Sequence, residues 1–442
     1  MGPEVNHVDT DGAVPSQADV VIIGGGVIGL ASALFLAERG VKIVLVEKGG
    51  IACEQSSRNW GWCRQSVRDP REFDLIREAL GLWRGMNERC QVDTGFRAAG
   101  ILFAARTESD EAQYREWSEK AARSGIESRI LGGKELADFL PGDRDLPRSA
   151  LYCASDGRAE PQWAGPAFAT AARRHGAVLL TQCAARGIET SAGSVSAVIT
   201  EKGTVKCKTV VVAGGAWSRR ILKDMNVSLP QLKVRASVAR TTPIDAGPAP
   251  ALWDGPTAFR KRADGGYTIA DGSPIVVPLT ADSFRYFFHF VPMLKMEWKG
   301  LRLKLNERFL TEWDEAKPVP WDKPSPYEKT RILDPKPDQQ YLDRLLARLR
   351  KRYPAFADAT IAQSWAGFID ATPDAVPVIS DVENISGLIV ATGFSGHGFG
   401  ISPGAGHLVA DLACGTKPIV DPREFRLSRF FDGSNPQPTS GV

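Results

Sequence analysis

The chain has no paired cysteines, no long apolar run and no excess of charge of one sign. Its seven cysteines stand singly in 442 residues, without the CxxC pairs of a zinc site or thiol redox motif, which indicates reduced thiols. No stretch reaches the ~18 consecutive apolar residues of a membrane-spanning helix. The 55 basic and 52 acidic residues leave a formal charge of +3, too little to attract nucleic acid. We therefore expect no metal site and no nucleic-acid partner.

The ends of the chain carry little apolar sequence. The first seventeen residues are acidic and polar where a secretory signal would have a basic start and an apolar run. We expect residues 1–17 and 433–442 to be flexible tails and the protein to be cytoplasmic. The whole chain is 43% hydrophobic, with 11 Trp and 19 Phe, and is long enough for two domains.

A glycine motif near the N-terminus is the first sign of function. The apolar run at 20–23 breaks directly into glycines, the pattern of a buried strand followed by a turn and a helix. Gly24, Gly26 and Gly29 have the G-x-G-x-x-G spacing that permits a tight turn, close approach of a pyrophosphate and helix–strand packing. The next strand delivers Glu47, whose carboxylate can accept hydrogen bonds from ribose hydroxyls. This context predicts a dinucleotide-binding fold and leaves nicotinamide and flavin open.

Two later segments favour flavin. Residues 209–218, TVVVAGGAWS, form a second apolar strand that ends in glycines. A third strand, 388–391, leads into a glycine-dense loop, 393–400, and then a helix from about residue 403 to residue 414. Glycines let backbone amides approach a flat ring, and a helix start stabilises negative charge on a reduced ring.

The nucleotide glycines, the VVVAGGAWS strand and the GFSGHGF loop give the chain a resemblance to the D-amino-acid oxidase, glycine oxidase and sarcosine oxidase superfamily over nearly its whole length. The likeness is closer still to the bacterial L-amino acid deaminases, in the stretches EKGGIACEQSSRNWG, CAARGIETSAGSVSAVITEKGTVKCKTVVVAGGAWSRR and LNERFL. The resemblance implies an α/β fold with a Rossmann-like (GR2-type) FAD-binding domain, made of residues 18–61, 150–230 and 361–432. It also implies an α+β substrate domain on an antiparallel sheet, made of residues 62–149 and 231–360.

The same resemblance implies the residues that bind FAD: Gly24, Gly26, Val27, Ile28, Gly29, Glu47, Lys48, Ser56, Ser57, Ala185, Ala213, Gly215, Trp217, Gly396, His397, Gly398, Phe399, Gly400 and Ile401. Three departures from it are informative. Ala366 stands where sarcosine oxidases have the cysteine that bonds the flavin, so we expect non-covalent FAD. Ile369 stands where glycine oxidases have a carboxylate-binding arginine. Gly400 stands where sarcosine oxidases have a lysine that promotes reaction with oxygen, which argues against fast oxidase behaviour.

The substrate site is expected beside the flavin ring. The resemblance implies that Arg260 holds a substrate carboxylate, as a guanidinium fork does bidentately; the alternative is a solvated basic strand. His397 polarises flavin or substrate, or only hydrogen-bonds its own loop. Arg64 and Gln65 follow the flavin loop and are expected to face the ring. Trp60 and Trp62 are expected either to wall the substrate side chain or only to pack.

These features predict an FAD-dependent amino acid dehydrogenase or deaminase, whose electrons go to a quinone or protein acceptor, or slowly to oxygen. One alternative is an oxidase or dehydrogenase for secondary amines such as N-alkyl amino acids, opines or sarcosine. Another is a flavin-bound relay subunit that docks through the aromatic stretch 284–298. Such a stretch without a second anchor predicts weak contact with the inner face of the membrane. An oligomer is compatible with the sequence.

Overall fold

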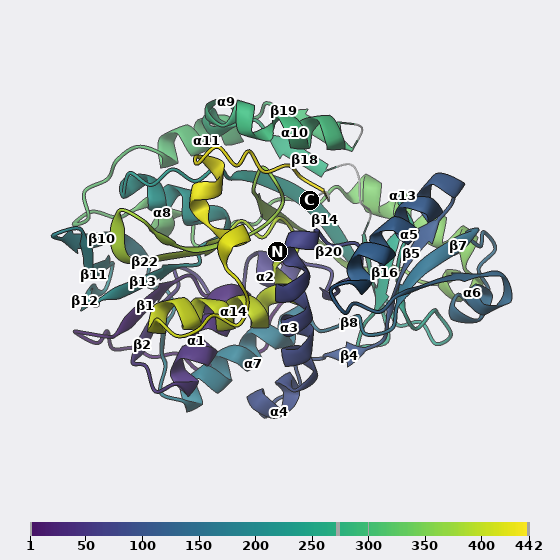
Figure 1. The fold of residues 1–442 in the computed structure, drawn as a ribbon, viewed down its shortest axis with the longest axis horizontal. Coiled ribbons are helices and arrows are strands. Elements are labelled where there is room, and N and C mark those ends of the chain that lie inside the picture. The colour runs from purple at the N-terminus through teal and green to yellow at the C-terminus, as the bar shows by residue number, and fades with distance from the viewer. Residues whose placement is uncertain (1, 271–274, 299, 440–442) are drawn as a thin grey trace.

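The computed structural model describes residues 2–270, 275–298 and 300–439, which are built around two large sheets (Figure 1). The first has the order β10-β11-β22-β13-β1-β2-β9, with β12 beside β11 and β21 beside β22. Its centre is parallel and buried on both faces, which is why β1 and β2 are apolar throughout instead of alternating. The strands are β1 Val20–Ile23, β2 Ile43–Val46, β9 Val178–Leu180, β10 Ala185–Ser191, β11 Ser194–Thr200, β12 Gly203–Lys206, β13 Thr209–Val212, β21 Val378–Val382 and β22 Ile385–Thr392.

Helices cover one face of this sheet and form its largest core. They are α1 Val27–Glu38, α3 Phe73–Arg84, α7 Pro161–Arg174 and α14 Gly398–Cys414, with the short α2 Gln55–Arg58, α4 Met86–Cys90 and α8 Ser218–Asp224 nearby. Helix α3 was expected in the substrate domain. Its apolar face, including Leu75, Ile76 and Trp83, instead packs with α1 and α14. The amphipathic pattern in the sequence shows that a helix buries one face, but it does not show which sheet that face packs against.

The second sheet has the order β19-β18-β14-β17-β16-β15-β5-β7-β6, with β20 beside β14. It is largely antiparallel, and Arg260 in β16 pairs with Thr268 in β17 across the DGG turn at 264–266. Helix α13, Gln339–Arg352, buries its leucines beneath it. The strands are β5 Ile101–Ala105, β6 Arg129–Gly132, β7 Ser149–Cys153, β14 Leu232–Thr241, β15 Ala251–Trp253, β16 Ala258–Lys261, β17 Tyr267–Ala270, β18 Ile275–Pro278, β19 Leu301–Lys304 and β20 Ile361–Ala371.

Two strands that were expected in the FAD domain, β7 and β20, belong to the second sheet. β7 pairs with β5 and β6 of the second sheet, although the FAD domain was expected to resume at residue 150. β20 pairs along its length with β14, so the stretch that was expected to reopen the FAD domain at residue 361 closes the substrate sheet. A small third sheet joins β3 Trp62–Cys63, β8 Gly157–Arg158 and β4 Arg97–Ala98 between the two.

The part of the chain between β18 and β20 carries α9 Ala281–Arg285, α10 Phe287–Glu297, α11 Arg308–Glu315 and α12 Pro326–Lys329, and most of it lies along the upper edge in Figure 1. α5 Glu108–Ala122 and α6 Gly133–Phe139 lie at the opposite end of the substrate sheet. Within the described ranges, no helix combines the length and hydropathy needed to cross a bilayer.

Both chain ends are attached to the rest of the protein, contrary to the expectation of flexible tails. The amides of Asn6, Asp11 and Ala18 donate to backbone carbonyls of the FAD domain at 2.8–3.0 Å. Near the other end, the hydroxyl of Thr439 donates to the carboxylate of Asp69 at 2.6 Å. Residues 1 and 440–442 of the two predicted tails lie outside the described residues.

Candidate functional site

A cavity, partly open to solvent, begins where β1, β2 and β13 end. Among the residues expected to bind FAD, the following line it: Gly24, Gly26, Val27, Ile28, Glu47, Lys48, Ser56, Ala185, Ala213, Gly215, Trp217, Gly396, Gly398 and Phe399. Thus glycines near both ends of the chain meet in one space, because parallel strands bring their carboxyl ends to one sheet edge.

The N-terminal glycines form a cradle without side chains at one end of this cavity. Gly24 has φ +117°, and a Cβ there would collide with the carbonyl of Ala213. A Cβ on Gly29 would collide with the carbonyl of Gly24, so this glycine provides close helix–strand packing and does not line the cavity. The first amide of α1, the N–H of Val27, donates to the hydroxyl of Ser56 at 2.8 Å. A helix start with free space and donating amides fits a pyrophosphate.

Glu47 closes the same end of the cavity. Its two carboxylate oxygens accept from the amides of Gly25 at 2.6 Å and Gly49 at 2.7 Å. Burial raises its pKa, and the charge of Lys48 and these two amides oppose that rise. A carboxylate held at the end of β2 beside the cavity fits an adenosine ribose, because it can accept hydrogen bonds from the ribose hydroxyls.

A strap, residues 325–334, covers this end and was not foreseen from the sequence. Tyr327, Arg331 and Ile332 line the cavity from the strap. The ammonium of Lys48 donates to the carbonyl of Arg331 at 2.6 Å, and the guanidinium of Arg331 pairs with Glu201. Partners so distant in the sequence leave no local pattern by which to find them.

The other end of the cavity is bounded by the glycine loop and by β20. Phe368 and Asp370 of β20 line it, whereas Ile369 points to the opposite face and packs with Val234 and Val277. Asp370 was not predicted as a site residue. Its Oδ2 accepts from the amide of Gly393 at 2.8 Å and so fixes the loop.

Four other predicted FAD residues do not line the cavity. The Ser57 hydroxyl donates to the carbonyl of Glu54 at 3.2 Å, and Ile401 lies in the core. A Cβ on Gly400 would meet the backbone of Trp62 and Cys63 within about 3 Å, so this glycine allows β3 to lie against α14. His397 does not line the cavity either, and its ring contacts Arg64.

Arg260 occupies a position that the sequence did not reveal. It is fully buried, and its Nη1 and Nη2 donate to the two oxygens of Glu160 at 2.7 and 2.9 Å. Its Nε donates to the carbonyl of Trp60. The fork expected to hold a substrate carboxylate is therefore occupied by a carboxylate of the chain. We correct the carboxylate-anchor prediction accordingly, since a residue 100 positions away supplies the partner.

Arg64 and His397 come together at 3.4 Å between Nη2 and Nε2. Burial, together with the charges of Arg68 and Arg64, holds the pKa of His397 well below its usual value. The imidazole is therefore neutral near pH 7. Gln65 points away from this pair, contrary to expectation, because its side-chain amide donates to the hydroxyl of Ser155.

The glycine cradle, the carboxylate of Glu47 and the C-terminal glycine loop together define a dinucleotide-binding oxidoreductase of the Rossmann-like type. The chain matches the family DAO, FAD dependent oxidoreductase, over residues 19–412, and belongs to it. FAD is therefore the cofactor that this cavity holds.

Known relatives resemble the chain over nearly its full length. The structure of L-amino acid deaminase from Proteus myxofaciens in complex with anthranilate has a TM-score of 0.94 and 33% identity, covering 97% of each chain. The L-amino acid deaminase from Proteus vulgaris has a TM-score of 0.92 and 35% identity, covering 96% of this chain and 100% of that one. A glycine oxidase from Pseudomonas aeruginosa is 24% identical, covering 92% of this chain and 97% of the relative.

Proposed function

We propose that the protein oxidises the C–N bond of an amino acid to an imino acid, which water hydrolyses to a 2-oxo acid and ammonia. One observation carries this proposal: His397, which stands between the cavity-lining glycines Gly396 and Gly398, is neutral and lies 3.4 Å from a partly exposed arginine, Arg64. A fixed cation is what a substrate carboxylate needs. The similarity to two L-amino acid deaminases supports the assignment.

FAD supplies the hydride acceptor when it is bound, so the chain has only to bind and orient the substrate. The substrate loses a hydride from its α-carbon and a proton from its nitrogen. The amine must be uncharged when the hydride leaves. Because His397 is neutral, it adds no positive charge to Arg64, and its ring can accept or donate one hydrogen bond.

The experiment is an anaerobic panel of amino acids and amines, followed by loss of the oxidised flavin absorbance near 450 nm. Release of ammonia from a primary amino acid supports the proposal. Release of an alkylamine, with primary amino acids inert, would instead establish the secondary-amine alternative. If no substrate bleaches the flavin while dithionite does, the proposed reaction is wrong.

We expect the FAD to be held without a covalent bond. Position 366 is an alanine whose side chain is fully buried, and its carbonyl accepts from the guanidinium of Arg58 at 2.9 Å. No thiol stands at that place to bond the flavin. Acid precipitation should therefore leave all of the yellow colour in the supernatant. Colour retained in the pellet after washing with denaturant would contradict this expectation.

For the electron acceptor we propose a partner other than oxygen. A lysine side chain at position 400 has no room, since a Cβ there already meets the backbone of Trp62 and Cys63. The expected result is fast reduction of an artificial quinone by the reduced enzyme and slow production of hydrogen peroxide in air.

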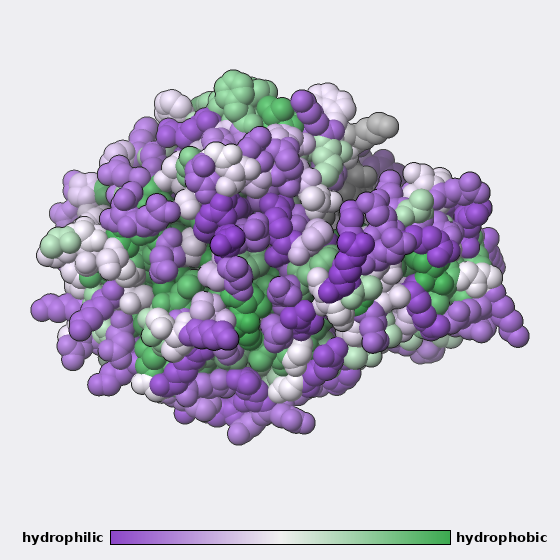
Figure 2. Space-filling model, viewed as in Figure 1, coloured by the Kyte–Doolittle hydropathy of each residue, from purple (hydrophilic) through white to green (hydrophobic). Residues whose placement is uncertain are grey.

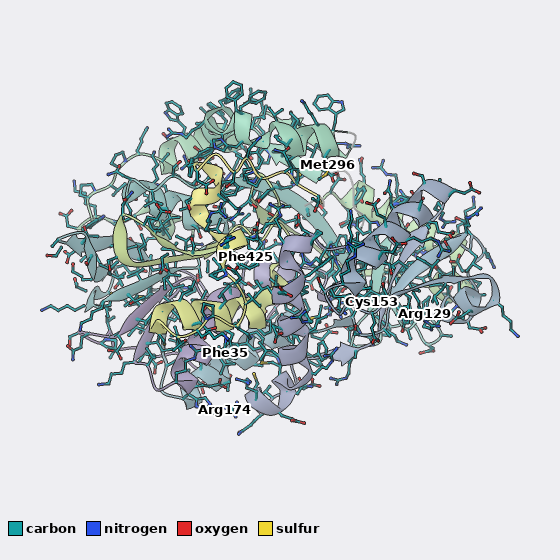
Figure 3. The ribbon with its side chains drawn as sticks, in the orientation of Figure 1. Phe35, Arg129, Cys153, Arg174, Met296 and Phe425 are labelled. Atoms are coloured by element: carbon teal, nitrogen blue, oxygen red, sulfur yellow. The ribbon has the colours of Figure 1, made fainter. Side chains whose placement is uncertain are left out.

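We also propose that the protein attaches peripherally to an anionic membrane surface through an aromatic patch. This patch consists of the exposed apolar side chains on α9 to α11, which protrude along the upper edge in Figures 2 and 3: Phe284, Phe287, Phe288, Met296, Trp298, Leu303, Leu305, Leu310 and Trp313. Phe288 is 85% exposed, an unusual state for a large apolar ring. Exposed Arg285, Lys295, Arg302 and Lys304 lie among these residues. Aromatic rings interleaved with basic residues suit an anionic lipid interface.

The double substitution Phe288→Glu and Trp298→Glu should abolish co-sedimentation with vesicles that contain phosphatidylserine. Two carboxylates in the patch oppose both its insertion into the interface and its attraction to anionic lipid. Val92→Glu, at an exposed valine outside the patch, is the matched control and should bind like the parent protein. Equal binding to vesicles of neutral lipid, or no effect of the double substitution, would refute the patch as the attachment site.

A further inference from the structure

Arg64 is an arginine in a deep position without an acidic partner. Among the described residues, no carboxylate lies within the 4.0 Å of an ion pair with its guanidinium. Its Nη1 donates to the carbonyls of Ser66 and Val67, and its Nη2 lies 3.4 Å from the ring of His397. The neighbouring buried arginines differ, since Arg260 pairs with Glu160 and Arg68 lies 3.5 Å from Glu72.

This setting is costly for the free protein. Burial and the charge of Arg68 lower the pKa of Arg64 to about 9, which still leaves the guanidinium charged at neutral pH. The charges of Asp156 and Glu72 favour the cation from beyond ion-pair distance, but the guanidinium lacks a direct carboxylate partner, which a carboxylate arriving from solution would supply. The side chain remains partly exposed, so such a carboxylate can reach it.

Next to Arg64 lies a chain of aromatic rings. The guanidinium sits 5.4 Å from the ring centre of Phe103, which is 6.1 Å from that of Trp62. Trp62 meets Trp60 at 5.2 Å, and Trp60 stacks with Trp253 at 5.7 Å. The three tryptophans are only partly buried, so they present ring surface to an incoming molecule. The indole N–H of Trp62 is buried and has no acceptor among the described residues.

Arg260 holds this aromatic surface in place. Its Nε donates to the carbonyl of Trp60, and a Cβ on Gly61, at φ +76°, would meet the same guanidinium. Glycine is therefore the one residue type at position 61 that lets the Trp60–Trp62 segment pass over Arg260. Withdrawing Arg260 to bind a substrate would remove the bidentate partner of buried Glu160 and leave it only Arg262 at 3.9 Å, which costs more than recruiting an arginine that has no carboxylate.

We propose that the substrate carboxylate binds Arg64, that a large planar side chain lies against Trp60, Trp62 and Trp253, and that Arg260 is a positioning residue. The substrate class is then an α-amino acid with an aromatic side chain. Only the amino group of this substrate class rests on the proposed function. The carboxylate and the ring are recognised whether or not the molecule is oxidised.

The test uses the FAD-loaded enzyme and 3-phenylpropionate, which has the carboxylate and the ring but no amino group to oxidise. Binding is followed by the change in flavin absorbance and by tryptophan fluorescence. Arg64→Gln should weaken binding roughly 10- to 100-fold, as expected for the loss of a charge-assisted hydrogen-bonded pair. Arg64→Lys should restore part of it. Arg84→Gln, at an exposed arginine on α3, is the matched control and should bind like the parent.

The planar pocket has its own readout. The parent enzyme should bind 3-phenylpropionate at least ten times more tightly than propionate, and Trp253→Leu should remove most of that preference while retaining affinity for propionate. Flavin content and circular dichroism verify that each variant is folded. If 3-phenylpropionate does not bind, or if Arg64→Gln binds it like the parent, the proposal is overturned.

The outcome separates this inference from the proposed reaction. Arg64-dependent binding in an enzyme whose flavin no amino acid bleaches would retain the carboxylate site and reject the reaction. Bleaching by amino acids with binding indifferent to Arg64 would retain the reaction and reject the site. Should a folded Arg260→Lys variant lose binding while Arg64→Gln keeps it, Arg260 would be the anchor after all.

Discussion

The substitution Gly26→Leu should yield a folded protein without FAD. Gly26 lines the cradle with φ −76°, a conformation open to any residue, so no backbone strain follows. Its Cβ would lie 3.1 Å from the hydroxyl of Ser56, and the rest of a leucine would fill the space before the first amides of α1. The pyrophosphate needs that same space, and so we expect at least a hundredfold loss of FAD affinity.

The measurement is the ratio of absorbance at 450 nm to that at 280 nm in the purified protein, followed by titration of the apoprotein with FAD. Gly81→Leu is the matched control, because Gly81 is exposed on α3 with no atom near the position of its Cβ. A Gly26→Leu protein that retains a full complement of FAD would show that the phosphates do not pass this glycine.

The second large effect concerns stability and comes from the buried pair of Arg260 and Glu160. Replacing Arg260 by leucine leaves the carboxylate of Glu160, 3% exposed, without its bidentate partner. The pKa of Glu160 is lowered in the folded protein because the charge and hydrogen bonds of Arg260 outweigh its burial. Breaking such a pair costs about 3–5 kcal/mol in the free energy of unfolding.

Urea unfolding near pH 7, followed by tryptophan fluorescence, measures this loss. The double substitution Arg260→Leu and Glu160→Leu should be less destabilising than Arg260→Leu alone, since it leaves no unpaired charge. Arg97→Ala provides the control, because it breaks an exposed pair with Asp93 and should cost less than about 1 kcal/mol. If Arg260→Leu unfolds at the same urea concentration as the parent, the pair does not stabilise the fold.

The pair also sets the pH range of the effect. A carboxylate with a lowered pKa stabilises the folded state above its unfolded pKa and loses that contribution as the pH falls through the lower folded value. The stabilisation by Glu160 should therefore be complete near neutral pH and decline in acid. The difference in stability between the parent and Arg260→Leu should shrink as the pH falls from neutral into the acid range, where Glu160 takes up a proton.

Much of the nucleotide end was accessible from the sequence. Gly24, Gly26 and Glu47 lie within one strand–turn–helix–strand unit, in which spacing alone fixes their relative positions. The later glycine segments were also identified, because apolar strands and glycine loops are local patterns. The strap that covers this end was not identified from the sequence, since Lys48 and Arg331 are 283 positions apart.

The substrate end was predicted far less well, and for one physical reason. Arg64, Gln65 and Arg260 were all named, yet which side chain faces the ring depends on strand register and on distant partners. Asp156 accepts from the amide of Gln65 at 2.7 Å, and Glu160 captures Arg260. Neither partner has a sequence signature. Asp370 was missed because a carboxylate in a strand looks like any solvent-facing residue until the cavity is seen.

The sequence by itself determined that this chain binds a dinucleotide and folds around a parallel sheet, because contiguous residues carry both the glycine turn and the apolar strands. Only the tertiary structure decided which arginine is paired and which has no carboxylate, against which sheet β7 and α3 pack, and that Trp60, Trp62 and Trp253 form one row of rings. A buried charge is defined by its neighbours in space, and those neighbours come from segments that only folding brings together.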